Sequence, residues 1–184
     1  MVRRPEGGVG YPDETLLDRD QWGVLWVRTA VRIGAGQPLF KQMNPRRQRR
    51  VMLRLLCQVC AEPADCTDDG RLWLLPADHM PDDDGWTDGT STVQPPVCQR
   101  CARLSIAMCP ALRTGHVVVR AHSRVVGVTG VVFQPVPPFP RMVATDYADL
   151  VAFTDVAARW TLATQLVRVL FDITRVDPAS LTGP

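Results

Sequence analysis

Three observations in the sequence predict an α+β fold. Two Cys-x-x-Cys pairs lie in the middle of the chain, at residues 57–60 and 98–101. Residues 116–135 hold Val-rich runs separated by polar and Gly residues, which are typical of strands. In residues 154–175, apolar side chains recur at three- and four-residue spacing, which is typical of an amphipathic helix. Strands and helices grouped around a cysteine-rich middle indicate one α+β domain.

Composition limits the functions that the chain can have. The 184 residues are 46% apolar, enough for a core of their own, and the net charge of +2 creates no overall field for nucleic acid or a membrane surface. The first residues, "MVRRPEGGVGYPDET", lack the apolar run of a signal peptide, and no stretch reaches the roughly 18 apolar residues of a membrane span. We therefore expect a cytoplasmic protein with no membrane partner.

The N-terminal part contains a tail and one short element. Residues 1–15 are rich in Gly, Pro and charge, so we expect a poorly ordered tail, followed by a single domain over 16–177 and a second tail over 178–184. Residues 22–33, "WGVLWVRTAVRI", fit a strand or a short helix, and the Val, Trp and Ile content favours the strand.

A basic helix is predicted to begin at Asn44 and Pro45. Asn is a favoured N-cap residue and Pro is favoured at the first helical position. The following "RRQRRVMLRLL" places its apolar residues on one side and leads directly into the first cysteine pair. The other positions are crowded with arginines, which are candidate nucleic-acid-binding residues: Arg46, Arg47, Arg49, Arg50 and Arg54.

The remaining elements follow from local pattern. Residues 71–76, "RLWLLP", predict a short strand, and the acidic, turn-rich stretch after them predicts a loop. The second cysteine pair is expected to open a short helix or turn. Residues 116–135 are expected to form two strands, and "PVPPFPR" to act as a stiff connector. The helix expected over 154–175 would pack across the sheet.

The cysteine spacing predicts one structural zinc site. Two thiolates separated by two residues reach one tetrahedral Zn²⁺ from a single turn, and two such turns complete four ligands, here Cys57, Cys60, Cys98 and Cys101. In a reducing cytosol such pairs bind metal more often than they form disulfides, although redox or core cysteines are the alternatives. A site closed by four thiolates organises the fold and does not activate water.

Two further cysteines stand outside the pairs. A free Cys behaves as a small buried hydrophobe, and this is our interpretation of Cys66 and Cys109. Either is near enough in sequence to replace one of the four ligands.

The order of these features resembles the zinc-knuckle branch of the HNH endonucleases, which have a treble-clef fold. An arginine-rich helix, Cys-x-x-Cys, a strand ending in Asp78-His79, a loop and a second Cys-x-x-Cys opening a helix carry the resemblance, over a zinc module of about residues 44–115. The resemblance implies that His79 activates water and that Asp78 shares a divalent metal with a second His. Ala102 occupies that second position, and Thr92 and Val93 stand where the family has an Asn.

More of the chain resembles a group of proteins from actinobacteria with GC-rich genomes. The shared features are "NPRRQRR", "LCQVC", "PPVCQRCA", "CPALR" and an Arg-Trp-Thr near residue 160, spread over residues 20–177. This resemblance implies a common fold and no particular activity.

These observations favour a non-catalytic, zinc-stabilised binding protein. The arginines of the predicted helix match phosphate geometry, so DNA, RNA or a nucleic-acid-handling protein is the expected partner; a solvated face on an Arg-rich chain is the alternative. A second hypothesis is a divergent HNH-type nuclease, in which Asp78, His79 and an aspartate among residues 82–84 hold an altered metal site. For Asp78 and His79 the alternative is a polar turn. A third hypothesis is a protein–protein adaptor.

Overall fold

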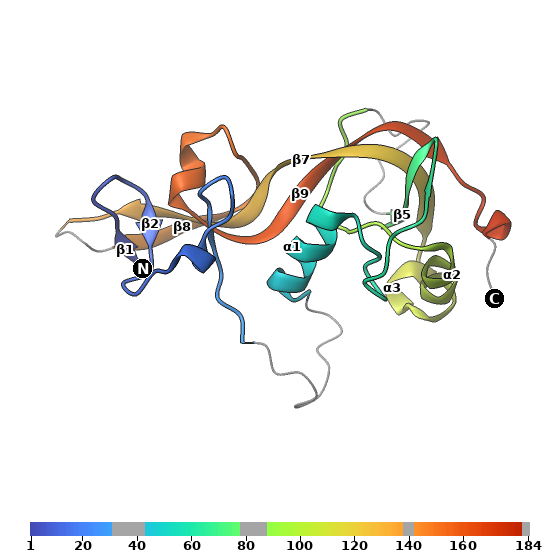
Figure 1. The fold of residues 1–184 in the computed structure, drawn as a ribbon, viewed down its shortest axis with the longest axis horizontal. Coiled ribbons are helices and arrows are strands. Elements are labelled where there is room, and N and C mark those ends of the chain that lie inside the picture. Colours follow the sequence, from blue (N-terminus) through green and yellow to red (C-terminus); the bar gives the residue numbers. More distant parts are fainter. Residues whose placement is uncertain (31–42, 78–87, 138–141, 182–184) are drawn as a thin grey trace. The chain divides into compact units, whose positions relative to one another are not determined.

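The computed structural model describes residues 1–30, 43–77, 88–137 and 142–181. Its fold is α+β, as the sequence predicts, with a mostly β-sheet core and few helices (Figure 1). The chain divides into two compact units, which we describe one by one. The first unit contains residues 1–47 and 126–167, and the second contains residues 48–125 and 168–184. Two long strands contribute to both units, namely β7 (His116–Pro135) and β9 (Thr161–Arg175).

The sheet has the strand order β3-β9-β7-β5-β4, with β6 beside β9 and β8 beside β7. Three of its strands are short: β3 (Leu25–Trp26), β4 (Cys66–Thr67) and β6 (Ser91–Thr92). Besides β7 and β9, the longer strands are β5 (Gly70–Pro76) and β8 (Met142–Ala152). Most pairs are antiparallel, but β3 runs parallel to the first residues of β9.

In the first unit, the second half of β7 pairs with β8, and the N-terminal segment adds a small two-stranded sheet. That sheet is β1 (Val2–Arg3) against β2 (Val9–Gly10). Two 3-10 helices, Leu16–Asp18 and Val156–Trp160, complete the unit. Gly130 lets β7 approach β9, because a Cβ added there would lie 2.3 Å from the carbonyl oxygen of Leu162.

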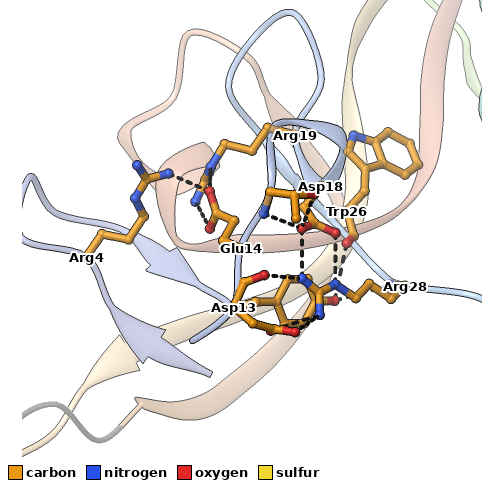
Figure 2. A network of polar contacts seen from close by, with 9 residues as sticks. Arg4, Asp13, Glu14, Asp18, Arg19, Trp26 and Arg28 are labelled. Atoms are coloured by element: carbon orange, nitrogen blue, oxygen red, sulfur yellow. Dashed lines mark hydrogen bonds and ion pairs between the residues drawn. The ribbon is translucent and has the colours of Figure 1, made fainter.

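A network of ion pairs holds the N-terminal segment together (Figure 2). Arg28 binds both Asp13 and Asp18, and its guanidinium lies 4.1 Å from the centre of the Tyr11 ring. Glu14 receives hydrogen bonds from Arg4 and Arg19 at 2.7 Å. These contacts join residues that are 5 to 15 positions apart along the chain, so they order the N-terminal segment.

The second unit is built from β5 against the first half of β7, with three helices. The helices are α1 (Pro45–Arg54), of which residues 48–54 belong to this unit, α2 (Gln99–Met108) and α3 (Pro110–Arg113). A 3-10 helix (Pro178–Ser180) follows near the end of the described chain. The β5–β7 register runs from Arg71 opposite Ala121 to Pro76 opposite His116. One buried cluster contains two of the cysteines, Cys57 and Cys101, together with Leu72, Leu74, Val97, Ala102, Leu112, Val118 and Leu181.

A buried arginine connects α1 to the sheet of the second unit. Arg168 on β9 is 6% exposed, and burial lowers its pKa to about 10. Its Nη1 donates to the carbonyl oxygen of Met52 in the last turn of α1 at 2.9 Å, and its Nε donates to the Ser123 hydroxyl at 2.9 Å. A cation at the C-terminal end of a helix is favourable, because the last carbonyls have no partner inside the helix.

Three local predictions are confirmed in the described residues: α1 begins at Pro45, β5 covers residues 71–76, and the second cysteine pair opens α2. The strand predicted over residues 22–33 is present only as β3, and residues 31–33 lie outside the described residues. The predicted N-cap is present, since the Oδ1 of Asn44 accepts the backbone N–H of Arg47 at 3.2 Å.

The predicted C-terminal amphipathic helix is wrong. Residues 156–160 form a 3-10 helix and residues 161–175 form strand β9. The strand is rich in Thr, Val and Ile, which favour strands, and it is buried on both faces around Leu166 and Val167. A strand buried on both faces shows no clean alternation, so its apolar residues also fit helical spacing.

Two more expectations differ from the structure. The sequence predicts a poorly ordered tail over residues 1–15, but this segment contains β1 and β2, and Val9 is fully buried. Polar contacts order it: the carbonyl oxygen of Val9, for example, accepts a hydrogen bond from Arg19 at 2.8 Å.

The sequence also predicts two strands over residues 116–135. The structure has the single strand β7 there, and the two halves of this strand pair with different partners.

Candidate metal centre

The first cysteine pair lies in a tight turn directly after α1. Leu55 ends the helix in the left-handed conformation, with φ of 51°, and the N–H of Leu56 returns to the carbonyl oxygen of Val51 at 2.9 Å. Cys57 follows at once. The turn is closed by two hydrogen bonds, from the N–H of Ala61 to the oxygen of Cys57 at 2.9 Å and from the N–H of Cys57 to the oxygen of Glu62 at 2.7 Å.

The second cysteine pair lies at the start of α2. Cys98 is the N-cap residue, Cys101 is in the first turn, and the N–H of Ala102 donates to the oxygen of Cys98 at 2.9 Å. The N–H of Gln58 donates to the oxygen of Pro96 at 2.9 Å, which fixes the first turn beside the second. The two pairs therefore meet although about 40 residues separate them in sequence.

The four sulfur atoms form one cluster. The Sγ atoms of Cys57, Cys60, Cys98 and Cys101 all lie within 4.8 Å of one another, and those of Cys60 and Cys98 are 3.9 Å apart. All four cysteines are free thiols and not disulfides. Tetrahedral zinc with Zn–S bonds of about 2.3 Å separates its sulfur ligands by about 3.8 Å. The cluster can therefore hold a metal ion with four thiolate ligands.

Burial and backbone hydrogen bonds act differently on the four thiols. Burial favours the neutral thiol of Cys57, but backbone N–H groups of Cys60, Cys98 and Val59 bind its sulfur and together lower its pKa to about 7. Burial raises the pKa of Cys98, and it raises the pKa of Cys101 well above the usual range. Hydrogen bonds from backbone N–H groups favour the thiolate form of Cys57, which is the form that binds a metal.

The cluster is part of the core on one side and is open to solvent on the other. Cys57 is fully buried and Cys101 is 7% exposed, whereas Cys60 is exposed and Cys98 is half-buried. An ion bound there would join α1, α2 and the apolar cluster of the second unit. With four protein ligands it would have no open position for a substrate.

Asp65 connects the two cysteine pairs from outside the cluster, and sequence reasoning missed it. Its carboxylate accepts hydrogen bonds from Gln99, at 3.0 Å, and from Arg120, and its N–H donates to the oxygen of Val97 at 3.1 Å. These partners are 32 to 55 residues away along the chain, so no local pattern identifies them.

The other two cysteines lie outside the cluster. Cys66 is exposed, which corrects the expectation that it is buried, because β4 is a short strand at the end of the sheet. Cys109 is half-buried against the apolar cluster, and its N–H donates to the oxygen of Ser105 at the end of α2. Neither belongs to the four-sulfur group.

The arginines of α1 occupy the helix face opposite its buried residues. Gln48, Val51 and Met52 are buried. Four of the five candidate arginines are exposed, namely Arg46, Arg47, Arg50 and Arg54, and Arg49 is half-buried. Arg46, Arg50 and Arg54 are spaced by four residues, so they form one stripe along the helix.

The candidate catalytic residues Asp78 and His79 lie outside the described residues, as do the aspartates at 82–84. Ala102, where the resemblance to the HNH endonucleases would place a second His, is fully buried in the apolar cluster. Its methyl side chain offers no ligand atom.

No protein-family model, curated protein or solved structure matches this chain. The cysteine cluster and the surfaces around it are therefore the features of the molecule that bear on its function. Among the helices of the described residues, none combines the length and the apolar character needed to cross a membrane.

Proposed function

We propose that this protein is a zinc-stabilised binding protein that engages nucleic acid, or a nucleic-acid-handling partner, through the arginine stripe Arg46, Arg50 and Arg54. The observation that carries the proposal is the position of this stripe: the helix that presents it runs directly into the four-cysteine cluster. A metal that orders the cluster would also fix the end of the basic helix.

Zinc is the metal that the donor set favours. Four thiolates from two Cys-x-x-Cys turns are the ligand set of structural zinc, and hard cations such as Mg²⁺ and Ca²⁺ prefer oxygen. The order of a cysteine turn, the β4–β5 hairpin and a second cysteine pair at the start of α2 supports a treble-clef-like arrangement. In this arrangement the ion is structural.

The spacing of the stripe supports an anionic partner. Like charges four residues apart on a helix destabilise it by about 0.2–0.5 kcal/mol for each pair. The stripe contains two such pairs and extends over about 12 Å of helix. Phosphates would offset this repulsion, and the guanidinium fork matches their geometry.

The closed thiolate site favours binding over catalysis. Four protein ligands leave no position for water, so the cluster cannot generate a metal-bound nucleophile. Among the described residues, the buried methyl group of Ala102 stands where an HNH-type site needs a histidine. The nuclease hypothesis therefore has no support from these residues.

Fluorescence anisotropy across a salt series tests the proposal, with duplex DNA and single-stranded RNA as probes. The double variant R50Q/R54Q removes two charges from the stripe, and R124Q/R175Q removes two exposed charges elsewhere. If two phosphate contacts are lost, the slope of log K against log salt for duplex DNA falls by about 2 in R50Q/R54Q. The control should keep the wild-type slope.

Two results would overturn the proposal. One is the absence of binding to either probe at low salt. The other is an equal loss of affinity in R124Q/R175Q and R50Q/R54Q, because overall charge and not the stripe would then determine binding.

A further inference from the structure

The first unit contains a hollow that the proposed function does not use. It has two compartments, of about 420 Å³ and 240 Å³, which share Trp22, Gly23 and Arg159 as lining residues. Arg4, Arg19 and Glu6 line the larger compartment, and Phe153 and Asp155 line the smaller one. The larger compartment falls within the range of small-molecule sites, about 300–1,000 Å³.

Trp22 forms an aromatic platform between the two compartments. Its ring stacks on Phe153 with the centroids 4.1 Å apart and the planes 10° from parallel. The Trp22 side chain is nevertheless 37% exposed. Trp22 lines the larger compartment as well as the smaller one, whereas Phe153 lines only the smaller one. A large, flat, half-exposed ring is suited to stack on another planar ring.

The turn that carries Trp22 is held in place before any ligand binds. The Asp20 carboxylate accepts the N–H of Trp22 at 2.9 Å and that of Val24 at 3.0 Å. Arg19 donates from Nη1 to the oxygen of Gly23 at 2.6 Å. A platform fixed in this way loses little conformational entropy on binding.

The arginines of the hollow differ in their availability. Arg4 is paired with Glu6 and Glu14, and Arg19 is paired with Glu14. The guanidinium of Arg159 is exposed and makes no hydrogen bond or ion pair within the part of the chain that the structure describes. Arg159 is therefore available for an anionic ligand.

The backbone of Arg159 is fixed although its side chain is not. The backbone of Gly8 passes so close that an added Cβ would lie 2.6 Å from the Arg159 carbonyl oxygen. Asp155, the other charged residue on this segment, already accepts the N–H of Ala157 at 2.8 Å. The lining carboxylates, Glu6 and Asp155, thus each have a partner, and the three lining arginines outnumber them.

We infer that this hollow binds a nucleoside monophosphate unit, with the base stacked on Trp22 and the phosphate bound by Arg159. Stacking on an aromatic ring beside a cationic group is the usual chemistry of nucleotide recognition without base-specific contacts. The bound nucleotide is either a free mononucleotide or one nucleotide of a single-stranded nucleic acid. The inference does not rest on the arginine stripe, because no residue that lines the hollow belongs to α1.

Isothermal titration of the metal-loaded full chain with AMP, adenosine and ribose 5-phosphate tests the inference. R159Q should weaken AMP binding at least tenfold and leave adenosine binding unchanged, because the charge acts on the phosphate alone. W22A should weaken both AMP and adenosine at least tenfold. W22F keeps a stacking ring and should stay within about threefold of wild type.

The controls are R175Q, which removes an exposed arginine from the second unit, and L16A, which removes a 97% exposed apolar side chain from the first. Both should bind AMP as the wild type does. Thermal melts of W22A and W22F show whether the first unit remains folded. If AMP produces no heat at millimolar concentration, or if R175Q weakens AMP binding as much as R159Q, the inference is wrong.

A single-stranded oligoadenylate distinguishes the two sources of the nucleotide. If the hollow takes one nucleotide of a strand, the oligomer binds more tightly than AMP and R159Q weakens both. If it takes a free mononucleotide, AMP binds more tightly than the oligomer. R50Q/R54Q should leave AMP affinity unchanged in either case, so failure of the arginine stripe and failure of the hollow give different results.

Discussion

Arg28 and Asp18 form a bidentate ion pair, in which the Nε of Arg28 lies 2.9 Å from the Oδ1 of Asp18 and its Nη2 lies 2.8 Å from Oδ2. Such paired hydrogen bonds fix the orientation of the two side chains relative to each other, and Figure 2 marks them with dashed lines. Asp18 also accepts the N–H of Thr15 at 2.7 Å. The same guanidinium binds Asp13, so a single arginine joins three points of the N-terminal segment.

This pair predicts that the first unit loses stability in acid. Hydrogen bonds from Arg28, and then from Thr15, hold the pKa of Asp18 well below its ordinary value of 3.8. A carboxyl with a lowered pKa in the folded state stabilises that state above its unfolded pKa and loses this effect as the pH falls through the folded value. We expect the melting temperature, followed by near-UV circular dichroism, to fall between about pH 4 and pH 2.

Substitution of either partner should remove part of this pH dependence. R28Q leaves Asp18 without its main partner, and D18N removes the titrating group. Both variants should melt at a lower temperature than wild type at pH 7 and show a flatter pH profile in acid. A profile parallel to that of wild type in both variants would contradict the role of this pair.

The four-cysteine cluster predicts one zinc ion per chain. Native mass spectrometry should show it, and removal by a chelator should unfold the second unit, because the ion would join α1, α2 and the apolar cluster. C57S and C101S should bind zinc at least tenfold more weakly, since each removes one of the four sulfur ligands. C66S and C109S are the matched controls and should keep one ion. Loss of zinc in a control, or full retention in C57S and C101S, would contradict this ligand set.

The cysteine cluster and the basic helix could be predicted because their signals are local. Two residues between cysteines determine a turn, and the Asn44–Pro45 pair determines where α1 begins. The hydrogen bond between Asn44 and Arg47 is the one expected of that sequence. Each cysteine turn and the start of α1 follow from neighbouring residues, and the repeated Cys-x-x-Cys spacing indicates that the two turns share one site.

Strand β9 and the Arg28 network could not be predicted, because distant residues determine them. Leu166 and Val167 are both buried, and only the neighbouring strands decide that adjacent residues on β9 face two covered sides. Arg28 meets Asp13 and Asp18, 15 and 10 residues earlier, at a spacing that no periodic pattern marks. Asp65 and Arg120 are 55 residues apart, which is further still.

The first cysteine turn predicts a stabilising substitution at Ala61. Ala61 has φ of 62°, a left-handed conformation that costs a residue with a Cβ about 1–2 kcal/mol and that Gly adopts freely. Gly loses more entropy on folding, so A61G should raise the free energy of unfolding by a net amount of about 0.5–1 kcal/mol. Urea denaturation of the zinc-loaded protein measures the change.

A second alanine in an ordinary conformation provides the control for Ala61. Ala107 is an exposed residue in the last turn of α2, where Gly costs less than in a helix interior, so A107G should destabilise the protein by about 0.5 kcal/mol. If A61G is as destabilising as A107G, the conformation of the turn does not limit stability.

The burial of Leu181, the last residue that the structure describes, indicates that the end of the chain stabilises the metal centre. Leu181 is 6% exposed and belongs to the same apolar cluster as Cys57 and Cys101, although the sequence predicts a tail at 178–184. The segment is held in place, because the N–H of Val176 donates to the oxygen of Val118 at 2.9 Å and the Asp177 carboxylate accepts the N–H of Ala179 at 2.9 Å. L181A should therefore lower the free energy of unfolding by about 2–3 kcal/mol, as for other buried leucines.

The effect of L181A should also extend to the metal. Because metal affinity and folding of the second unit are coupled, the variant should lose zinc to a competing chelator at a lower chelator concentration than wild type. P178A is the matched control, since Pro178 is exposed in the same segment, and it should change stability by less than about 0.5 kcal/mol. Equal unfolding midpoints for L181A and P178A would show that Leu181 does not contribute to the core. A lower midpoint with unchanged zinc retention would show that the core around Leu181 and the cysteine cluster fold independently.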